Sequence, residues 1–472
     1  MRRIRGLADL AGHLQGEIDG RSCRIRDVEI DDGPVQIEGL QADRLEIGNL
    51  DVMGLVVFRD CFVADLQIVG CGAEGVLLIG CRVERLVVRN LARGTRLRIS
   101  GGDFGRIAVH DVVDVAIDAT ECGSSLSISG VRRHVSLDRV TAGSITIAEQ
   151  LGVDPGAEVT VVGTRVIDNF EVHDLHLAAL CMTDSRVDRH LWLRRLTVDR
   201  ELTLDEVRCE SCLLLDGITC EGPVTLSRCI LRDGVEGARL RRRAAGEPVL
   251  HLDRSRVGAS MSVTLATEPG EVVLHDTEVE GQIVFPDPAP CYRMTGATTV
   301  ARIDVPETAM RTTRRMEELA VRSFGERSAA VYGVMRSSFG RRQRLFEEDL
   351  CYFLQRTAES RDLRPPARWV ARYLYGAVFG WGVRILPPVR AMALGIGLTA
   401  VVLDLAAPPS VVPDGDAGSA VTLAGALWFN VGTGLPSQLT SAAWSAIAVG
   451  LTAVGLLLLT VIVGITIRRL VR

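Results

Sequence analysis

The feature that most constrains the fold is an apolar alternation that recurs about every ten residues through the first part of this 472-residue chain. In each unit one apolar residue stands at a position i and another at i+2, as in "RLEIGNL" and "RLVVRNL". This period of two is typical of a β-strand with one buried face. The position i is occupied by Leu45, Leu55, Leu66, Val76, Leu86, Leu97, Ile107, Val115, Leu126, Val135 and Ile145, and later by Val159, Phe170, Leu191, Leu202, Leu213, Val224, Leu250, Val272 and Ile283.

Strands as short as these cannot bury an apolar face alone, so regular repetition indicates that they stack coil upon coil. Ten residues are too few to circle a core, and we therefore expect about two units in each turn. Frequent glycine and aspartate at the unit boundaries, without a helical spacing, favour a β-solenoid over a helical one.

In one stretch the spacing falls to five residues, and this pattern resembles the pentapeptide-repeat family. Many units lack the small residue that precedes the central apolar residue in that family. The resemblance implies an all-β, right-handed β-solenoid, which we expect over residues 1–290. The five-residue spacing is seen at Val56, Cys61, Leu66, Cys71, Val76, Cys81, Leu86 and Leu91.

The cysteines of this region have two interpretations. Four of them lie close enough in sequence to be weak candidates for a zinc site: Cys209, Cys212, Cys220 and Cys229. Three of these four also follow the ten-residue spacing, so buried core positions are the favoured interpretation. We find no nucleophile–base pair and no phosphate-binding loop, and His173 and His176 have no cluster of carboxylates near them in sequence. We therefore expect neither an enzyme nor a cofactor.

Charge divides the chain into three parts. Residues 1–305 carry a net charge of −12, residues 306–390 carry +7 and residues 391–472 carry 0, which together give −5. The first residues, "MRRIRGLADLAGHLQGEIDG", lack the apolar segment of a secretory signal. We therefore expect the acidic part in the cytoplasm, where it meets an unknown ligand or protein, and we expect no nucleic acid as partner.

The basic part is expected to be a helical linker over residues 291–387. Apolar residues recur at intervals of three and four within residues 306–360, which predicts helices. The segment "ARWVARYLYGAVFGWGVRILPPVR" then interleaves aromatic residues with arginine. That composition is typical of a segment at a membrane surface.

Residues 388–472 are expected to form an α-helical membrane domain in the inner (plasma) membrane. The apolar segments 391–407 and 442–467 are each about long enough for one crossing. Arg390 precedes the first segment and three arginines follow the second, while none lies between them. By the positive-inside rule, both termini of this multi-pass protein lie in the cytoplasm.

A third apolar segment, 420–429, lies between these two and is too short to cross a bilayer. Ser419 is positioned to cap it as a helix. The glycine-containing sequence "NVGTGLPSQLTS" follows it. Non-helical backbone at membrane depth is tolerated only where protein buries it or where it lines a watery cavity. This order of segments predicts a re-entrant pore helix.

The order of span, short helix, Gly-x-Gly and span resembles the two-transmembrane pore module of the potassium-channel superfamily. The upstream segments "AAVYGVMRSSFGRRQRLFEEDLCYF" and "GWGVRILPPVRAM" look like the linker that joins pentapeptide repeats to such a pore in bacterial proteins. The resemblance covers residues 325–472 and implies a homotetramer in the lipid bilayer that conducts monovalent cations. It also implies a pore helix that includes Leu427, Trp428 and Phe429, and a hinge at Gly455.

Two alignments of the filter compete. One is anchored on Gly-x-Gly and places the filter at Asn430, Val431, Gly432, Thr433 and Gly434. The other is anchored on "ALWF" and places it near "PSQLT", where the filter motif is lost. In the first alignment, which we favour, Asn430 and Thr433 replace the family's threonine and tyrosine, so the resemblance implies weak or unknown selectivity.

Asp404 is a candidate for a carboxylate ring at the outer mouth of the pore, and its alternative is an ordinary carboxylate at the membrane surface. Two functions therefore remain open for the whole chain. One is a cation conduit whose cytoplasmic solenoid acts as a sensor or assembly platform. The other is a non-conducting membrane anchor that presents the acidic solenoid to a protein partner.

Overall fold

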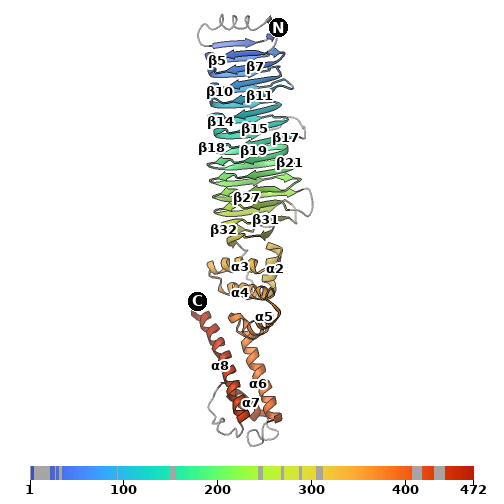
Figure 1. Cartoon of the computed structure of the whole chain (residues 1–472), viewed down its shortest axis with the longest axis vertical. Helices are drawn as coiled ribbons and strands as arrows, with labels where there is room; N and C mark the ends of the chain where they lie inside the picture. The colour runs from blue at the N-terminus through green and yellow to red at the C-terminus, as the bar shows by residue number, and fades with distance from the viewer. Residues whose placement is uncertain are drawn as a thin grey trace. The chain divides into compact units, whose positions relative to one another are not determined.

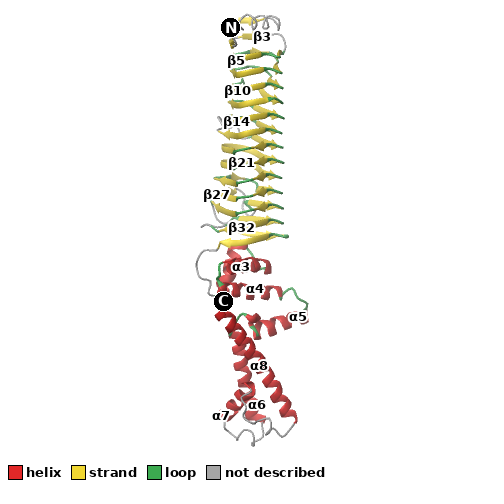
Figure 2. Ribbon diagram, turned by 90° about the vertical axis from the view of Figure 1, so that its left-hand side faces the viewer, coloured by secondary structure: helices red, strands yellow, loops and turns green. Residues whose placement is uncertain are grey.

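The structure is a computed structural model, and the chain divides into a strand-rich unit and a helical unit near Pro306. The strand-rich unit is a parallel β-solenoid of about 12 turns (Figures 1 and 2). The predicted solenoid class is therefore confirmed. The structure describes residues 2–4, 22–26, 28–30, 34–92, 94–148, 156–242, 248–266, 270–285, 290–304, 312–406, 417–429 and 442–471.

Most strands pair in parallel within two long ladders along the solenoid. The first ladder contains β2 (Ser22–Arg26), β5 (Gln41–Gly48), β8 (Phe62–Val69), β10 (Arg82–Arg89), β12 (Asp103–His110), β14 (Glu121–Ser129), β16 (Thr141–Ala148), β19 (Phe170–Thr183), β21 (Leu191–Asp205), β23 (Cys212–Asp216), β27 (Gly234–Arg242), β30 (Ser260–Leu265), β32 (Glu278–Val284) and β34 (Thr299–Asp304). The second contains β4 (Val35–Glu38), β7 (Leu55–Arg59), β9 (Gly75–Ile79), β11 (Arg96–Ser100), β13 (Asp114–Asp118), β15 (His134–Asp138), β17 (Ala157–Val162), the later parts of β19 and β21, β25 (Val224–Ser227), β28 (Leu250–Asp253), β31 (Glu271–His275) and β33 (Cys291–Thr295).

Shorter strands complete the coils. They are β18 (Arg165–Val166), β20 (Arg186–Val187), β22 (Arg208–Cys209), β24 (Thr219–Cys220), β26 (Ile230–Leu231) and β29 (Arg256–Val257). A separate three-stranded sheet is made of β1 (Arg2–Ile4), β3 (Val28–Ile30) and β6 (Asp51–Val52). The last two strands of the solenoid, β33 and β34, lie beyond residue 290, where we expected the domain to end.

The register shows why the sequence period is ten residues and the structural period is twice that. Leu45 pairs with Leu66, and Leu66 pairs with Leu86, all in the first ladder. Val56 pairs with Val76 in the second ladder. Successive units therefore alternate between the two ladders, with two units in each turn. These five side chains are buried in the core. In the second unit the buried residue is Val56, whereas Leu55 is half-buried, so our assignment of position i to Leu55 was wrong by one residue.

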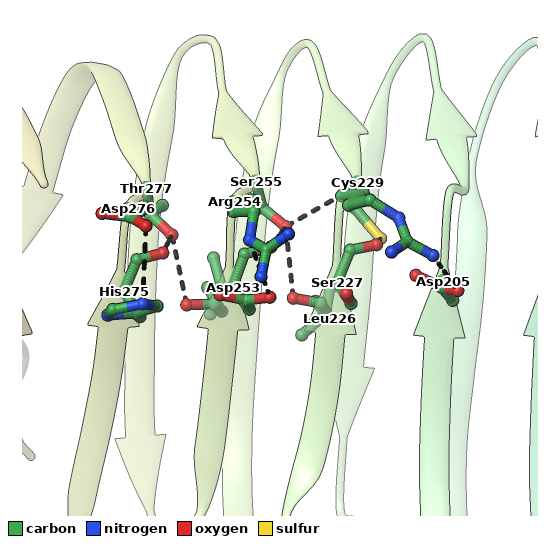
Figure 3. A network of polar contacts seen from close by, with 12 residues as sticks. Asp205, Leu226, Ser227, Cys229, Asp253, Arg254, Ser255, His275, Asp276 and Thr277 are labelled. Atoms are coloured by element: carbon green, nitrogen blue, oxygen red, sulfur yellow. Dashed lines mark hydrogen bonds and ion pairs between the residues drawn. The ribbon is translucent and has the colours of Figure 1, made fainter. Parts of the chain in front are cut away.

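A row of small polar side chains closes one corner of the coils (Figure 3). Ser255 Oγ lies 3.0 Å from the carbonyl oxygen of Asp253 and 3.1 Å from that of Leu226 in the preceding coil. The same hydroxyl accepts a hydrogen bond of 3.0 Å from the backbone N–H of Cys229. Arg254, just before this serine, has a φ of 45°. That left-handed conformation turns the chain at the corner, and the inward side chain bonds backbone groups that the turn leaves unpaired.

The helical unit begins with a group of short helices and continues with three apolar helices. The short ones are α2 (Thr313–Phe324), α3 (Ala329–Arg341), α4 (Leu345–Glu359), α5 (Pro365–Trp369), the π-helix η1 (Val370–Val378) and the 3-10 helix η2 (Gly380–Gly382). The apolar ones are α6 (Leu386–Ala406), α7 (Ala417–Phe429) and α8 (Ala442–Val471). Helix α6 starts earlier than expected because Pro387 and Pro388 fit its first turn. Helix α7 already includes Ser419, which we had expected to cap it.

Two of these helices are long and apolar enough to cross a membrane. The spanning segments are Leu386–Ala406, with a mean hydropathy of 1.8, and Ser445–Arg468, with a mean hydropathy of 2.7. Only 17% of each segment is buried within the chain, so most of their apolar side chains lie exposed. This combination supports an association with a membrane.

Candidate functional site

The short apolar helix α7 packs against both long apolar helices at one end of the helical unit (Figures 1 and 2). Against α6, small residues allow close packing: Ala420 and Ala424 of α7 are buried with Ala400 and Leu403 of α6. Small residues at helix contacts let two backbones approach closely, which is the usual way helices associate within a membrane.

Trp428, in the last turn of α7, makes the most specific contact with α6. Its indole ring is buried, and its Nε1 donates a hydrogen bond of 3.0 Å to Thr399 Oγ1. A Cβ atom placed at Gly395, one turn earlier in α6, would lie 2.2 Å from the indole ring. The ring therefore occupies space that only glycine leaves free, and the hydroxyl satisfies its one polar group.

Helix α8 contacts the same last turn of α7. Thr452 Oγ1 donates a hydrogen bond of 2.7 Å to the carbonyl oxygen of Leu427. A Cβ atom placed at Gly455 would lie 2.0 Å from the carbonyl oxygen of Trp428 and 3.0 Å from its Cα. The backbone of α7 therefore touches α8 at Gly455, without an intervening side chain.

These contacts have a chemical consequence for the end of α7. The last carbonyl groups of a helix have no partner within the helix and require water, side chains or ligands. Here a threonine of α8 provides one such partner for Leu427. Helix α7, which is too short to span a bilayer, is therefore held by α6 and α8, which are long enough to span one. The two long helices contact both the side chains and the backbone of α7.

The residues predicted for this site are distributed as follows. Trp428 is buried, Leu427 is half-buried and the side chain of Phe429 is 39% exposed. Gly455, expected as a hinge, is buried in the continuous helix α8. Asp404 is exposed on α6, and no arginine among the described residues forms an ion pair with it. The filter candidates Asn430, Val431, Gly432, Thr433 and Gly434 lie outside the described residues, as does "PSQLT".

Sequence reasoning missed Gly395, Thr399 and Thr452. Each is a small residue or a threonine within an apolar segment, and such residues are enriched where membrane helices touch. That signal was present in "AMALGIGLTAVV", which contains Gly395 and Thr399. It did not show which helix each residue faces.

Replacing Thr399 or Thr452 by valine is expected to destabilise the helical unit by about 1 kcal/mol each, because each change removes the hydrogen-bond partner of a polar group in the last turn of α7. Thermal unfolding of the purified full chain in detergent measures this. Thr460→Val is the control, since Thr460 Oγ1 bonds the carbonyl of Leu456 within its own helix. Equal losses in all three variants would contradict the assigned contacts.

The short helices are tied to the end of α8 by an ion pair. Arg468, near the end of α8, lies 3.0 Å from Asp349 Oδ1 of α4, and both side chains are partly buried. Arg384, between η2 and α6, stacks on the ring of Phe353 of α4 at 3.9 Å. The ends of α6 and α8 that lie away from α7 are therefore both held by the same helix, α4.

An exposed aromatic surface lies along α5 and η1. Trp369 and Tyr373 stack with ring centroids 4.9 Å apart and are 62% and 51% exposed, and Tyr375 is 51% exposed. Arg368 and Arg372 are exposed on the same segment. Aromatic rings beside arginine are what the sequence predicted for a membrane surface, and the structure leaves them free to meet one.

The four cysteines considered for zinc lie on neighbouring strands of adjacent coils, with Cys209 in β22, Cys212 in β23, Cys220 in β24 and Cys229 just before β26. Cys209 pairs in register with Val187 and Leu231, whereas Cys220 pairs with Val198. Among the described residues, no three His, Cys, Asp or Glu side chains are grouped as a metal site requires. Burial raises the pKa of the Cys209 thiol to about 11 and that of Cys229 to about 12, which keeps both protonated.

These raised pKa values predict that the buried thiols resist alkylation in the folded chain. A maleimide at pH 7 or pH 9 is expected to leave Cys209 and Cys229 unmodified, because both pKa values lie above pH 9 and the thiolate is the reactive form. Cys212, which is half-buried, is expected to react faster. Peptide mass spectrometry measures the modification, with the unfolded chain as the control. Rapid labelling of Cys229 before unfolding would contradict its buried position.

Comparisons of the chain with protein-family models, with curated proteins and with solved structures find no match. The functional argument therefore depends on the residues and geometry described above.

Proposed function

We propose that this chain is a homo-oligomeric membrane protein that conducts cations, with α7 as a re-entrant helix beside the conduction path. The proposal is based on the packing and hydrogen bonding of the short helix α7 against both α6 and α8. The tetramer is the assembly that the resemblance to the potassium-channel pore module implies.

The proposal is supported by the need of backbone N–H and C=O groups for hydrogen-bond partners inside a membrane. A chain that enters a bilayer and turns back within it needs partners for its backbone groups, from protein or from water. Thr399 of α6 and Thr452 and Gly455 of α8 supply a protein environment for the end of α7. The backbone that follows α7 begins with Asn430, Val431 and Gly432, which is where the favoured alignment places the filter.

Selectivity is expected to be weak. In the related pore modules, filter carbonyls replace the hydration shell of potassium, and a tyrosine braces their position. Thr433 stands at that tyrosine position here, and Asn430 replaces the first threonine. We expect sodium and potassium to be conducted at comparable rates, with the solenoid as a cytoplasmic sensor or assembly platform.

A flux assay tests the proposal. The purified full chain is reconstituted into liposomes loaded with potassium, and efflux is followed with a potassium-selective electrode. We expect efflux that depends on protein and persists when sodium replaces potassium. A protein that inserts and assembles as an oligomer but gives no efflux above empty liposomes would contradict conduction.

One observation favours the alternative of a non-conducting anchor with a protein-binding solenoid. Ion pairs connect successive coils on the exposed surface, for example Arg139 with Asp118 and Arg239 with Asp216, each at 2.7 Å. Such pairs contribute little to stability when exposed, but they fix a defined pattern of charge along a stiff surface. Absence of efflux from an inserted oligomer would favour this alternative.

A further inference from the structure

A cavity of about 370 Å³ lies within the helical unit beside the start of α6. Its lining is partly apolar, from Phe346 and Leu350 of α4 and from Val383 and Leu386. The side chains of Phe346 and Leu386 are about half exposed, at 48% and 52%, so apolar surface continues from the cavity to the outside. The cavity combines this apolar surface with charge.

The charge of the cavity is positive. Arg384 and Arg390 line it, and neither forms an ion pair with a carboxylate among the described residues. Asp349 also lines the cavity, but Arg468 neutralises it at 3.0 Å. Two unpaired guanidinium groups therefore face a partly apolar space.

Arg384 is held in place without a counter-charge. Its guanidinium carbon lies 3.9 Å from the centroid of the Phe353 ring, and the side chain is half-buried. Burial lowers the pKa of Arg384 from its usual value, and no carboxylate offsets this effect. A charged group that is partly removed from water is stabilised by an anion that can reach it.

We propose that this cavity binds the phosphate group of an anionic phospholipid, with Arg384 and Arg390 as its phosphate ligands. Arginine offers a planar set of donors that matches phosphate oxygens. Two arginines without carboxylate partners favour an anionic headgroup over a zwitterionic one, whose own cation they would repel.

The apolar lining decides between a lipid and a soluble phosphate. A free phosphate ion gains nothing from Phe346 and Leu386, whereas the glycerol and first acyl carbons of a lipid cover them. Exposed apolar residues continue along α6 at Val389 and Leu394, which is the direction the acyl chains require. This inference rests on the part of the proposed function that places α6 in a bilayer, and it does not depend on conduction.

The test uses the purified full chain in a neutral detergent, titrated with short-chain phosphatidylglycerol and followed by thermal unfolding. Parallel titrations use short-chain phosphatidylcholine and inorganic phosphate. We expect only phosphatidylglycerol to raise the unfolding temperature. Equal stabilisation by phosphatidylcholine would overturn the phosphate site, and equal stabilisation by inorganic phosphate would overturn the lipid as its source.

Substitutions of the residues that line the cavity test whether phosphatidylglycerol binds there. Arg384→Gln and Arg390→Gln are each expected to weaken phosphatidylglycerol binding by about tenfold, the usual effect of losing one hydrogen bond to a charged group. Arg390 is exposed, so its replacement is expected to leave the fold intact. Asp349→Asn is expected to tighten binding, because it leaves Arg468 without its carboxylate partner and so adds positive charge beside the cavity.

Arg315→Gln is the matched control, since Arg315 is an exposed arginine of α2 that lines neither the cavity nor the aromatic surface of α5 and η1. We expect it to bind phosphatidylglycerol as the unmodified chain does. An equal loss in this control would mean general attraction to positive charge and would overturn the site. A chain that fails to insert into membranes would instead contradict the proposed function, so the two failures are distinguishable.

Discussion

Replacing Gly455 by leucine is expected to abolish cation efflux and to destabilise the helical unit by about 1–3 kcal/mol or more, the usual cost of overpacking a close contact. The physical reason is the 2.0 Å separation between a Cβ atom at this position and the carbonyl oxygen of Trp428. Backbone cannot move aside as a flexible side chain can, so α7 must leave its position. Thermal unfolding in detergent and liposome efflux measure the two effects.

Gly450→Leu and Gly464→Leu are the matched controls, because a Cβ atom at either position would meet no atom of another described element within 4 Å. All three glycines lie on α8, so the three substitutions have the same effect on helix propensity. The account predicts a loss at Gly455 alone. Equal stability and efflux in Gly455→Leu and the unmodified chain would show that α7 does not pack there.

Replacing Phe104 by alanine is expected to destabilise the solenoid by about 3–5 kcal/mol, the range for removing a large buried aromatic side chain. Phe104 is fully buried, and it stacks in register between Val83 and Cys122 of the neighbouring coils. Each coil contacts mainly its neighbours, so a cavity at one coil weakens the contacts to both. Urea unfolding followed by circular dichroism measures the loss.

Phe62→Ala is the control for this prediction, because Phe62 lies on a strand of the same ladder but is 51% exposed. Its loss is expected to cost less than about 1 kcal/mol, since its one specific contact, with the Arg82 guanidinium 5.7 Å from the ring centroid, lies on the exposed surface. A similar cost for both variants would contradict the inward and outward assignment of the two phenylalanines.

The solenoid could be predicted from sequence because its information is local and repeated. The alternation at Leu45, Leu66 and Leu86 specifies a strand and its buried face, and the repetition specifies stacking. Two features could not be read in this way. The domain boundary was placed before β33 and β34, because "CYRMT" and "TVARID" lack a clean ten-residue spacing. The left-handed corner at Arg254 uses a residue that sequence rules do not associate with that conformation.

The helical unit was predictable in its segments but not in its contacts. Hydropathy alone indicates α6, α7 and α8, since it depends on composition along the chain. The pairing of Trp428 with Thr399 and of Asp349 with Arg468 depends on how the helices pack in space. Asp349 and Arg468 are 119 residues apart, and no local pattern connects residues at that separation.

The most direct test of the proposed conduction is single-channel recording of the purified full chain in a planar bilayer. The account predicts discrete current steps that are carried by cations, with similar reversal potentials for sodium and potassium gradients. It also predicts that these steps are absent in Gly455→Leu and present in Gly450→Leu. Bilayers that contain the inserted oligomer yet show no current above protein-free bilayers would contradict it.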